Sequence, residues 1–252
     1  MHDVERLSAV LEAARRILVF SGAGISTGSG IPDFRGPQGV WKTRQPVYFG
    51  EFMVSAKKRV EYWEYKVEAH DAFMSAKPNA AHGAVVRLEK AGRVKAVVTQ
   101  NIDGLHQAAG SSAAKVIEIH GTNREIECTS CGAREEPARA VAVFRETQVC
   151  PTCAACGGFL KFATISFGQA LNPETIERAS QEAREADLVL ALGSTLSVSP
   201  ANQVPLVAAR RGAPYIIVNR GETDHDDIAT LKLDGDVVEI LPAAVDALAR
   251  ER

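Results

Sequence analysis

Short apolar segments alternate with longer amphipathic segments along most of the chain. Six runs of four to six mostly apolar residues have the length and composition of strands that are buried on both faces. They span residues 17–20, 94–99, 116–119, 188–192, 214–218 and 237–241. Strands that alternate with helices in this way predict an α/β fold with a doubly wound, Rossmann-like parallel sheet.

Helix signals occupy the intervals between these runs. Asp3 is expected to cap a first helix, whose apolar stripe contains Leu7, Val10, Leu11 and Ala14. Capping residues and helical periodicity predict further helices over residues 79–92, 172–186 and 201–211. Aromatic residues at irregular helical spacing indicate a small helical module over residues 47–76.

Polar or glycine-rich segments directly follow five of the apolar runs. "SGAGIS" begins at residue 21, "QNIDGLH" at residue 100 and "GST" at residue 193, while His120 and Asn219 follow two others. In open α/β sheets, the ligand crevice lies outside the carboxyl ends of the strands. We therefore expect these segments to meet at one site, although they are spread over about two hundred residues.

Composition limits the classes of function. The chain has 252 residues, of which 46% are hydrophobic and 24% charged, and its formal net charge is −2. These values fit a soluble globular protein with one large domain, or one large and one small domain. Charges of both signs are mixed, which argues against a nucleic-acid partner, and no apolar run approaches the ~20 residues that cross a membrane. Because no secretory leader pattern is visible, we expect a cytoplasmic protein.

The segment "FSGAGISTGSGIPDFRGPQGVW" at residues 20–41 has some features of a nucleotide-binding turn. Its small residues allow backbone N–H groups to approach a pyrophosphate, but the glycine spacing departs from G-x-G-x-x-G. The acidic residue typical of hydride-transfer enzymes is missing about twenty positions later, and so is a Walker-type sequence. Asp33, Phe34 and Arg35 add a charged and aromatic cluster that an ordinary surface loop does not need. The pattern indicates a dinucleotide site without hydride transfer or ATP chemistry.

All five cysteines lie between residues 128 and 156, which indicates a metal site rather than a disulfide framework. Cys128 and Cys131 form one C-x₂-C pair. The second pair is either Cys150 with Cys153 or Cys153 with Cys156. Two such pairs predict a four-cysteine zinc ribbon, and its closed ligand shell makes the metal structural.

Several segments together resemble the sirtuins, the NAD-dependent protein-lysine deacylases. They are "GAGISTGSGIPDFRG", "TQNIDGLH", "HG" at 120–121, the paired cysteines, "FGQAL", "GSTLSVSP" and "VN" at 218–219. The resemblance covers residues 15–242, and the segments occur in the family's order. It implies that NAD is consumed: the bond between nicotinamide and ribose breaks, and the acyl oxygen of a substrate lysine captures the ribose.

The resemblance implies that the loops that follow the strands form the NAD site. Phe34 is expected to cover the ribose and exclude water. The implied catalytic residues are Phe34, Asn101, Asp103 and His120. The implied cofactor-binding residues are Gly22, Ala23, Gly24, Ser26, Thr27, Asp33, Phe34, Arg35, Trp41, Gln100, Asn101, Ile102, Asp103, Gly193, Ser194, Thr195, Asn219, Arg220, Gly221 and Val237.

His120 is the implied general base. An imidazole titrates near neutral pH and can accept a proton from a ribose hydroxyl. Taken alone, a histidine after a strand is more often structural, and the resemblance reverses that interpretation. The other histidines are expected to be structural: His2, His70, His82, His106 and His225.

The resemblance also chooses between the two zinc arrangements. Because "CGG-x-L" follows the last cysteine, it selects Cys128, Cys131, Cys153 and Cys156 as ligands and leaves Cys150 outside the site. An acyl-lysine peptide is expected to bind as an added strand between residues 167–171 and 193–198.

The implied domains are discontinuous in sequence. The NAD-binding domain is expected to contain residues 1–35, 78–121 and 165–252. A small domain is expected to combine a helical module, residues 36–77, with a zinc-ribbon insertion, residues 122–164.

Some positions depart from the sirtuin pattern. Lys161-Phe162 stands where Arg-Pro is usual, and Gln169 stands where glutamate is usual. The branch that removes acidic acyl groups carries Tyr-x-x-Arg in the helical module, and "EYWEYKV" contains no arginine, so the resemblance does not favour that activity. The segments "FMVSAKKRVEYW", "TQVCPTCAACGG" and "DDIATLKL" resemble the mitochondrial-type class most.

Deacetylation of protein lysine is therefore the expected activity. Two alternatives would use the same site: protein mono-ADP-ribosyl transfer and removal of long-chain or lipoyl groups. A third alternative is an inactive NAD sensor. The sequence does not predict the preferred acyl group, the protein target, the oligomeric state or the effect of the departures.

Overall fold

The computed structural model describes residues 2–33, 39–42 and 44–250. In this part of the chain, six parallel strands form one sheet. Their order is β3 (Val116–Glu118), β2 (Val94–Thr99), β1 (Ile17–Ser21), β7 (Leu188–Leu192), β8 (Tyr215–Asn219) and β9 (Leu231–Asp234). From β1 the chain adds strands toward one edge of the sheet (β2, β3), and from β7 it adds them toward the other edge (β8, β9). Open α/β sheets bind ligands where this order reverses, which here is between β1 and β7. The prediction of a doubly wound parallel sheet is confirmed.

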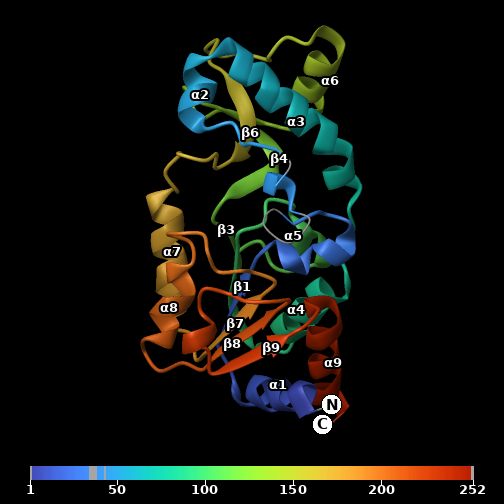
Figure 1. The fold of residues 1–252 in the computed structure, drawn as a ribbon, viewed down its shortest axis with the longest axis vertical. Coiled ribbons are helices and arrows are strands. Elements are labelled where there is room, and N and C mark those ends of the chain that lie inside the picture. The colour runs from blue at the N-terminus through green and yellow to red at the C-terminus, as the bar shows by residue number, and fades with distance from the viewer. Residues whose placement is uncertain (1, 34–38, 43, 251–252) are drawn as a thin grey trace.

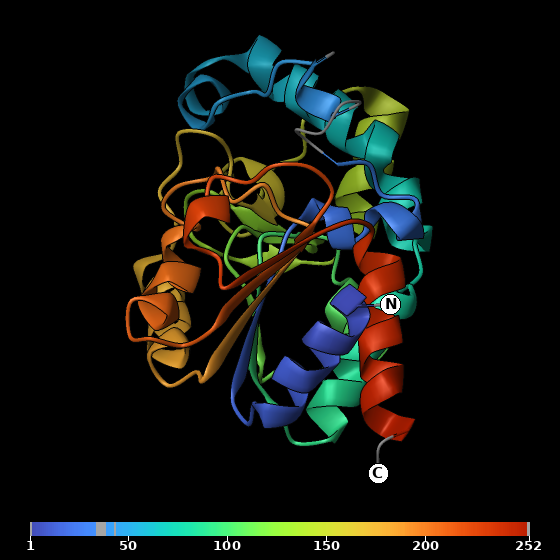
Figure 2. The same ribbon diagram turned by 60° about the horizontal axis from the view of Figure 1, so that its bottom comes forward.

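Helices cover both faces of this sheet (Figures 1 and 2). The helices α1 (His2–Ala13), α4 (Ala80–Lys90) and α9 (Val237–Arg250) pack on one face. The helices α7 (Pro173–Arg184) and α8 (Gln203–Ala209) pack on the other. A short helix, α5 (Leu105–Ala109), lies between β2 and β3 in sequence.

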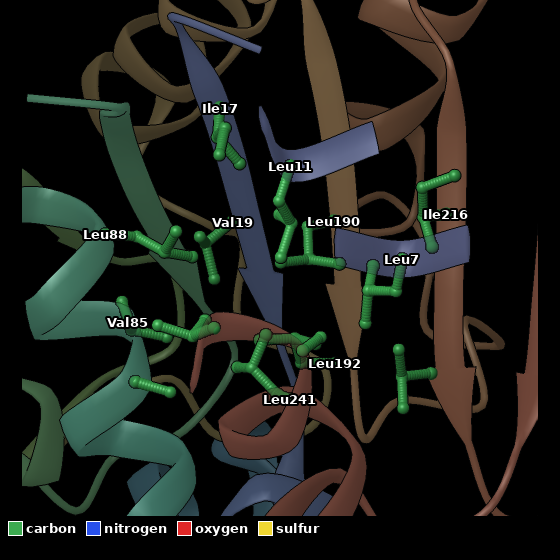
Figure 3. Close-up of a cluster of buried hydrophobic side chains, with 14 of the residues drawn as sticks. Leu7, Leu11, Ile17, Val19, Val85, Leu88, Leu190, Leu192, Ile216 and Leu241 are labelled. Atoms are coloured by element: carbon green, nitrogen blue, oxygen red, sulfur yellow. The ribbon is translucent and has the colours of Figure 1, made fainter. Parts of the chain in front are cut away.

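The apolar runs are continuous because both faces of each strand are buried. In β1, Ile17 and Val19 belong to the core under α1, α4 and α9, whereas Leu18 and Phe20 belong to the opposite core. Figure 3 shows the first core, where Leu7 of α1 lies near the strands together with side chains of α4 and α9. Burial on both faces explains why periodicity located these strands correctly.

A second, smaller unit lies at one end of the long axis (Figure 1). Its antiparallel sheet has the order β5 (Arg134–Glu135), β4 (Gly121–Cys128), β6 (Leu160–Thr164). The helices α2 (Phe49–Val54), α3 (Ala56–Ser75) and α6 (Pro137–Thr147) share a core with it. Trp63 is fully buried in this core, and its indole N–H donates to the carbonyl of Leu160 at 3.1 Å. We call this unit the small domain.

The connecting segments contain four short 3₁₀ turns among the described residues. They are Ala23–Ile25, Thr27–Ser29, Val40–Lys42 and Asp226–Ile228.

No described helix is long and apolar enough to cross a membrane.

Two sequence predictions about local structure are wrong. Residues 237–241 begin helix α9, and the sixth strand is β9. The apolar positions continue at helical spacing through Ala244 and Leu248, and all are buried. Because β9 is an edge strand, its sequence Leu-Lys-Leu-Asp alternates and shows no continuous apolar run. In α1, Asp3 lies within the first turn instead of before it, where its charge still favours the helix dipole.

Candidate functional site

The loops after β1, β2, β3, β7 and β8 line one cavity of about 1850 Å³. Typical small-molecule pockets measure roughly 300–1,000 Å³, so this cavity has room for a dinucleotide and part of a second ligand. The predicted site residues that line it are Gly22, Ala23, Gly24, Thr27, Asp33, Gln100, Asn101, Ile102, His120, Gly193, Ser194, Thr195, Asn219, Arg220, Gly221 and Val237. The expected convergence of distant loops is therefore observed.

Glycines let the loops after β1 and β7 interlock. The N–H of Gly24 donates to the carbonyl of Gly193 at 2.8 Å. A Cβ on Gly22 would lie 2.8 Å from that carbonyl oxygen, and one on Gly24 would lie 2.7 Å from the Cα of Gly193. Gly193 itself has φ +61°, a left-handed conformation that side chains disfavour. This contact brings the two backbones together at the point where the winding of the sheet reverses.

Buried hydrogen bonds hold Asn101 and Asp103 against the first loop. The Asn101 side-chain amide donates to the Gly22 carbonyl and to the Ser26 hydroxyl, both at 3.1 Å. That hydroxyl donates to Asp103 Oδ2 at 2.7 Å, and Asp103 Oδ1 accepts from the Leu105 N–H at 2.9 Å. Asn101, Asp103 and Ser26 also line a neighbouring hollow of about 10 Å³, close to the volume that one water requires. Hydrogen bonds within the protein therefore hold these polar groups in place.

His120 lies between β3 and β4, where the two sheets join. Its Nδ1 is 3.1 Å from the carbonyl oxygen of Gln100. A carbonyl can only accept, so Nδ1 carries the proton and Nε2 of the neutral ring is the basic nitrogen. The Gln100 side chain donates to the Ser194 hydroxyl at 2.8 Å. The segments after β2, β3 and β7 are therefore connected around the imidazole.

The far end of the cavity is formed by the segments after β8 and β9. Asn219 is buried, and its side-chain amide donates to the Arg220 carbonyl at 2.9 Å. The Gly221 N–H donates to Asp234 Oδ1 at 2.8 Å, and Arg220 forms an ion pair with Asp236 at 2.6 Å. These contacts fix a polar turn that suits the adenosine part of a dinucleotide.

The cysteines of the small domain form a compact cluster. The Sγ atoms of Cys128, Cys131, Cys153 and Cys156 all lie within 4.8 Å of one another. The distances are 3.5 Å between Cys128 and Cys156 and 3.8 Å between Cys131 and Cys153, which suits a tetrahedral zinc ion with Zn–S bonds of about 2.3 Å. Backbone N–H groups of Cys131 and Ser130 lower the pKa of the Cys128 thiol to about 6, favouring the thiolate.

The four clustered cysteines are the predicted zinc ligands, and Cys150 lies outside the cluster. With four protein ligands, such a zinc ion has no open position for a substrate, so its function is structural.

Comparison with known proteins decides the family. The chain matches the family model described as the Sir2 family over residues 22–200. It belongs to the Sir2 family. This Sir2 protein is 42% identical over 238 residues to the NAD-dependent protein deacetylase of Rhodopseudomonas palustris, and the match covers 94% of each chain. It is 40% identical over 245 residues to the NAD-dependent protein deacetylase of Sulfolobus acidocaldarius, a match that covers 97% of this chain and 95% of that protein.

Solved structures of Sir2 proteins share the fold. A structure described as "Structural Basis for the Mechanism and Regulation of Sir2 Enzymes" has a TM-score of 0.89 and 36% sequence identity, covering 100% of this chain and 99% of that chain. A complex described as Sir2 with a p53 peptide and NAD⁺ has a TM-score of 0.87 at 36% identity, covering 98% and 99%.

Two departures from the family pattern have structural explanations in this Sir2 protein. The Lys161 ammonium is buried and donates to the carbonyls of Phe162 and Thr164, so it supports the end of β6. Gln169 Oε1 accepts from the Ser166 N–H at 3.1 Å, a contact that a carboxylate oxygen would also make. Both residues shape the segment that leads to residues 167–171, which line the cavity as expected.

Two of the predicted structural histidines form a buried pair. The His106 imidazole is 2.9 Å from the Ser21 hydroxyl, and its ring lies 5.1 Å from that of His82. Burial lowers the pKa of His106 to about 3 and that of His82 to about 4, so both are neutral at physiological pH. They fill the interior behind the site and hold no catalytic proton.

Part of the predicted site is not described, and part of the observed site was not predicted. Phe34 and Arg35, and the side chain of Trp41, lie outside the described residues, so their roles stay predictions. The small domain adds a cavity wall that includes Lys66 from α3 and Phe162 from β6. These residues lack a local signal because a long-range contact between a helix and a strand places them there.

Proposed function

We propose that this Sir2 protein is an NAD-dependent protein-lysine deacetylase. One acyl-lysine, one NAD and one water would give a free lysine, one O-acyl-ADP-ribose and one nicotinamide. The observation that carries the proposal is that Asn101 and His120 line one cavity with room for a dinucleotide and part of a second ligand. Asn101 and Asp103 also line the small hollow beside it. When bound, NAD supplies the bond between nicotinamide and ribose that breaks.

The residues present fit NAD. The interlocked glycines after β1 and β7 leave backbone groups at the cavity surface, as a pyrophosphate requires. Asn219 and Gly221 provide the polar turn for the adenosine, while Gln100 and Asn101 lie on the opposite side, near the histidine. The extended cavity thus matches a molecule with two nucleoside ends.

His120 would act as the general base. Its Nε2 is the proton acceptor because the Gln100 carbonyl holds the proton on Nδ1. Asn101 and Asp103 would bind ribose hydroxyls, the carboxamide or an ordered water, as their residue types allow. Their buried hydrogen bonds hold them in place, so little reorganisation is needed when substrate binds.

An acyl-lysine peptide would enter between residues 167–171 and 193–198. Residues of both segments line the cavity, and neither segment is part of a strand. A peptide added as a strand would form hydrogen bonds with the backbone groups of these segments. The protein would therefore discriminate only weakly between different peptide side chains. The zinc site would stabilise the small domain, whose strand β6 leads into the first of these segments.

Product analysis tests this function. Purified protein is incubated with NAD and an acetyl-lysine peptide, and the products are identified by mass spectrometry. We expect free lysine on the peptide, nicotinamide and O-acetyl-ADP-ribose. ADP-ribose attached to protein without deacetylation would instead establish the transferase alternative, and NAD binding without nicotinamide release would establish the sensor alternative.

A further inference from the structure

The face of α3 that lines the cavity ends at an aromatic residue, Phe73. Tyr62, Lys66 and Ala69 line the cavity earlier on the same helix, and Phe73 continues their spacing of three or four residues. Phe73 lies in the last turn of α3 and is partly buried. None of the three hydrophobic cores among the described residues includes it. Core packing therefore does not account for this aromatic side chain.

Phe73 lines two spaces at once. It borders the large cavity, and it also borders the hollow of about 10 Å³ beside Asn101. Ser26 and Asp103 line this hollow and do not line the large cavity, so their polar groups lie behind the wall that the two spaces share. Within the described part of the chain, that wall consists of Phe73, Ala23, Ile31, Asn101 and Ile102.

The chain after α3 is attached to the loop that carries Ser26. The Asn79 side-chain amide donates to the carbonyl of Ile25 at 2.7 Å and to the hydroxyl of Ser29 at 2.9 Å. Asn79 Oδ1 also accepts from a backbone N–H in the first turn of α4 at 2.9 Å, as a helix cap does. The connection between α3 and α4 is thus fixed to the loop after β1, and this limits how far Phe73 can move from Ser26.

Water competes with the acyl oxygen in the proposed reaction. Attack of a water oxygen on the ribose carbon would form ADP-ribose. Nicotinamide would leave with the electron pair of the broken bond, and the water would lose one proton. Ser26 and Asp103 are groups that can bind and orient a water molecule, and their neighbour Asn101 is expected beside the ribose. An apolar ring between these groups and the cavity excludes water from that position.

We propose that Phe73 is a specificity-determining residue that directs the reaction toward the acyl group and away from water. Its ring separates Ser26 and Asp103 from the large cavity, and the remaining hollow has room for one water at most. The inference rests on the proposed function. It is distinct from the prediction that Phe34 excludes water, because Phe73 comes from a different segment of the chain, helix α3.

The substitution Phe73→Ala tests this role, because it joins the hollow to the cavity. We expect nicotinamide release by this variant to exceed deacetylation of an acetyl-lysine peptide, with the excess found as ADP-ribose by mass spectrometry. In the wild type the two amounts should agree. Without peptide, the variant should release nicotinamide about tenfold faster than the wild type, a ratio that corresponds to about 1.4 kcal/mol in one barrier. Equal release and deacetylation in the variant would overturn the inference.

Two further variants separate water access from an effect on the fold. Phe73→Leu keeps an apolar side chain in the wall and should retain most of the agreement between release and deacetylation. Met74→Ala is the matched control, because it shortens an exposed apolar side chain in the same helical turn, and it should behave as the wild type. The inference is wrong if Met74→Ala gives the same excess, or if Phe73→Ala slows release and deacetylation equally.

Crystal structures of the wild type and of Phe73→Ala give a readout that does not depend on turnover. In the variant, the hollow beside Ser26 and Asp103 should open into the cavity and contain more than one ordered water. The wild type should contain one at most, and an unchanged hollow in the variant would overturn the inference. If the wild type releases no nicotinamide with NAD and peptide, the proposed function fails, and these structures still decide whether Phe73 forms the wall.

Discussion

The two walls of the cavity are encoded in different ways. The sheet edge is built from loops whose polar residues lie in short sequence motifs, such as "QNIDGLH" and "GST". The small-domain wall places Lys66 against Phe162, residues that are almost a hundred positions apart, without any shared motif. The sheet edge could therefore be predicted from local sequence, whereas the small-domain wall depends on a long-range contact between α3 and β6.

The largest expected effect comes from a substitution of His120 at the sheet edge. His120→Ala removes the proposed base, and we expect kcat/KM for deacetylation to fall about 10²- to 10⁴-fold. NAD binding should survive, because the interlocked glycines and Asn219 lie on other loops. Steady-state kinetics and calorimetric NAD titration measure the two effects. Unchanged turnover would show that His120 is not the base.

A zinc-ligand substitution tests the small domain as a whole. Cys153→Ser opens the four-cysteine shell, and we expect loss of zinc and a fall of about 3 kcal/mol or more in the free energy of unfolding of that domain. Cys150→Ser is the control, since Cys150 lies outside the cluster. Metal analysis and thermal denaturation measure both. Loss of zinc from the Cys150 variant would mean that the ligands are assigned wrongly.

Glycine substitutions measure how tightly the first and seventh strands' loops are interlocked. Gly193→Ala combines a left-handed residue with a Cβ that collides with the backbone of Gly24 and Ile25, and it should cost about 2–5 kcal/mol of stability. Gly212→Ala, at φ +89° with nothing within 4 Å, should cost only about 1–2 kcal/mol. Denaturant unfolding gives the difference. Equal costs would show that the close contact does not matter.

The sequence predicted the sheet edge well because each of its parts is local. A strand buried on both faces is a continuous apolar run, and the polar loop that follows it is adjacent in the chain, as at Gly22 and Asn101. The choice of Cys156 over Cys150 also rested on adjacent residues. The structure adds the contacts that hold these loops, such as the amide of Asn101 on Ser26.

The remaining features depend on contacts between distant segments. The edge position of β9 makes its sequence alternate, and only the packing of α9 on the sheet shows that residues 237–241 are helical. Lys66 looks like an ordinary helix-surface lysine until α3 packs against β6, which places its ammonium near Asn123 and Phe162. Local patterns contain neither fact, because both depend on where other elements lie.

The central claim is that one cavity brings NAD and an acyl-lysine together. Its most direct test is the release of nicotinamide by the wild-type protein, measured with and without an acetyl-lysine peptide and compared with the amount of peptide deacetylated. We predict release that depends on the peptide and equals deacetylation one to one. Nicotinamide release that is unaffected by the peptide, or deacetylation without NAD, would contradict the account.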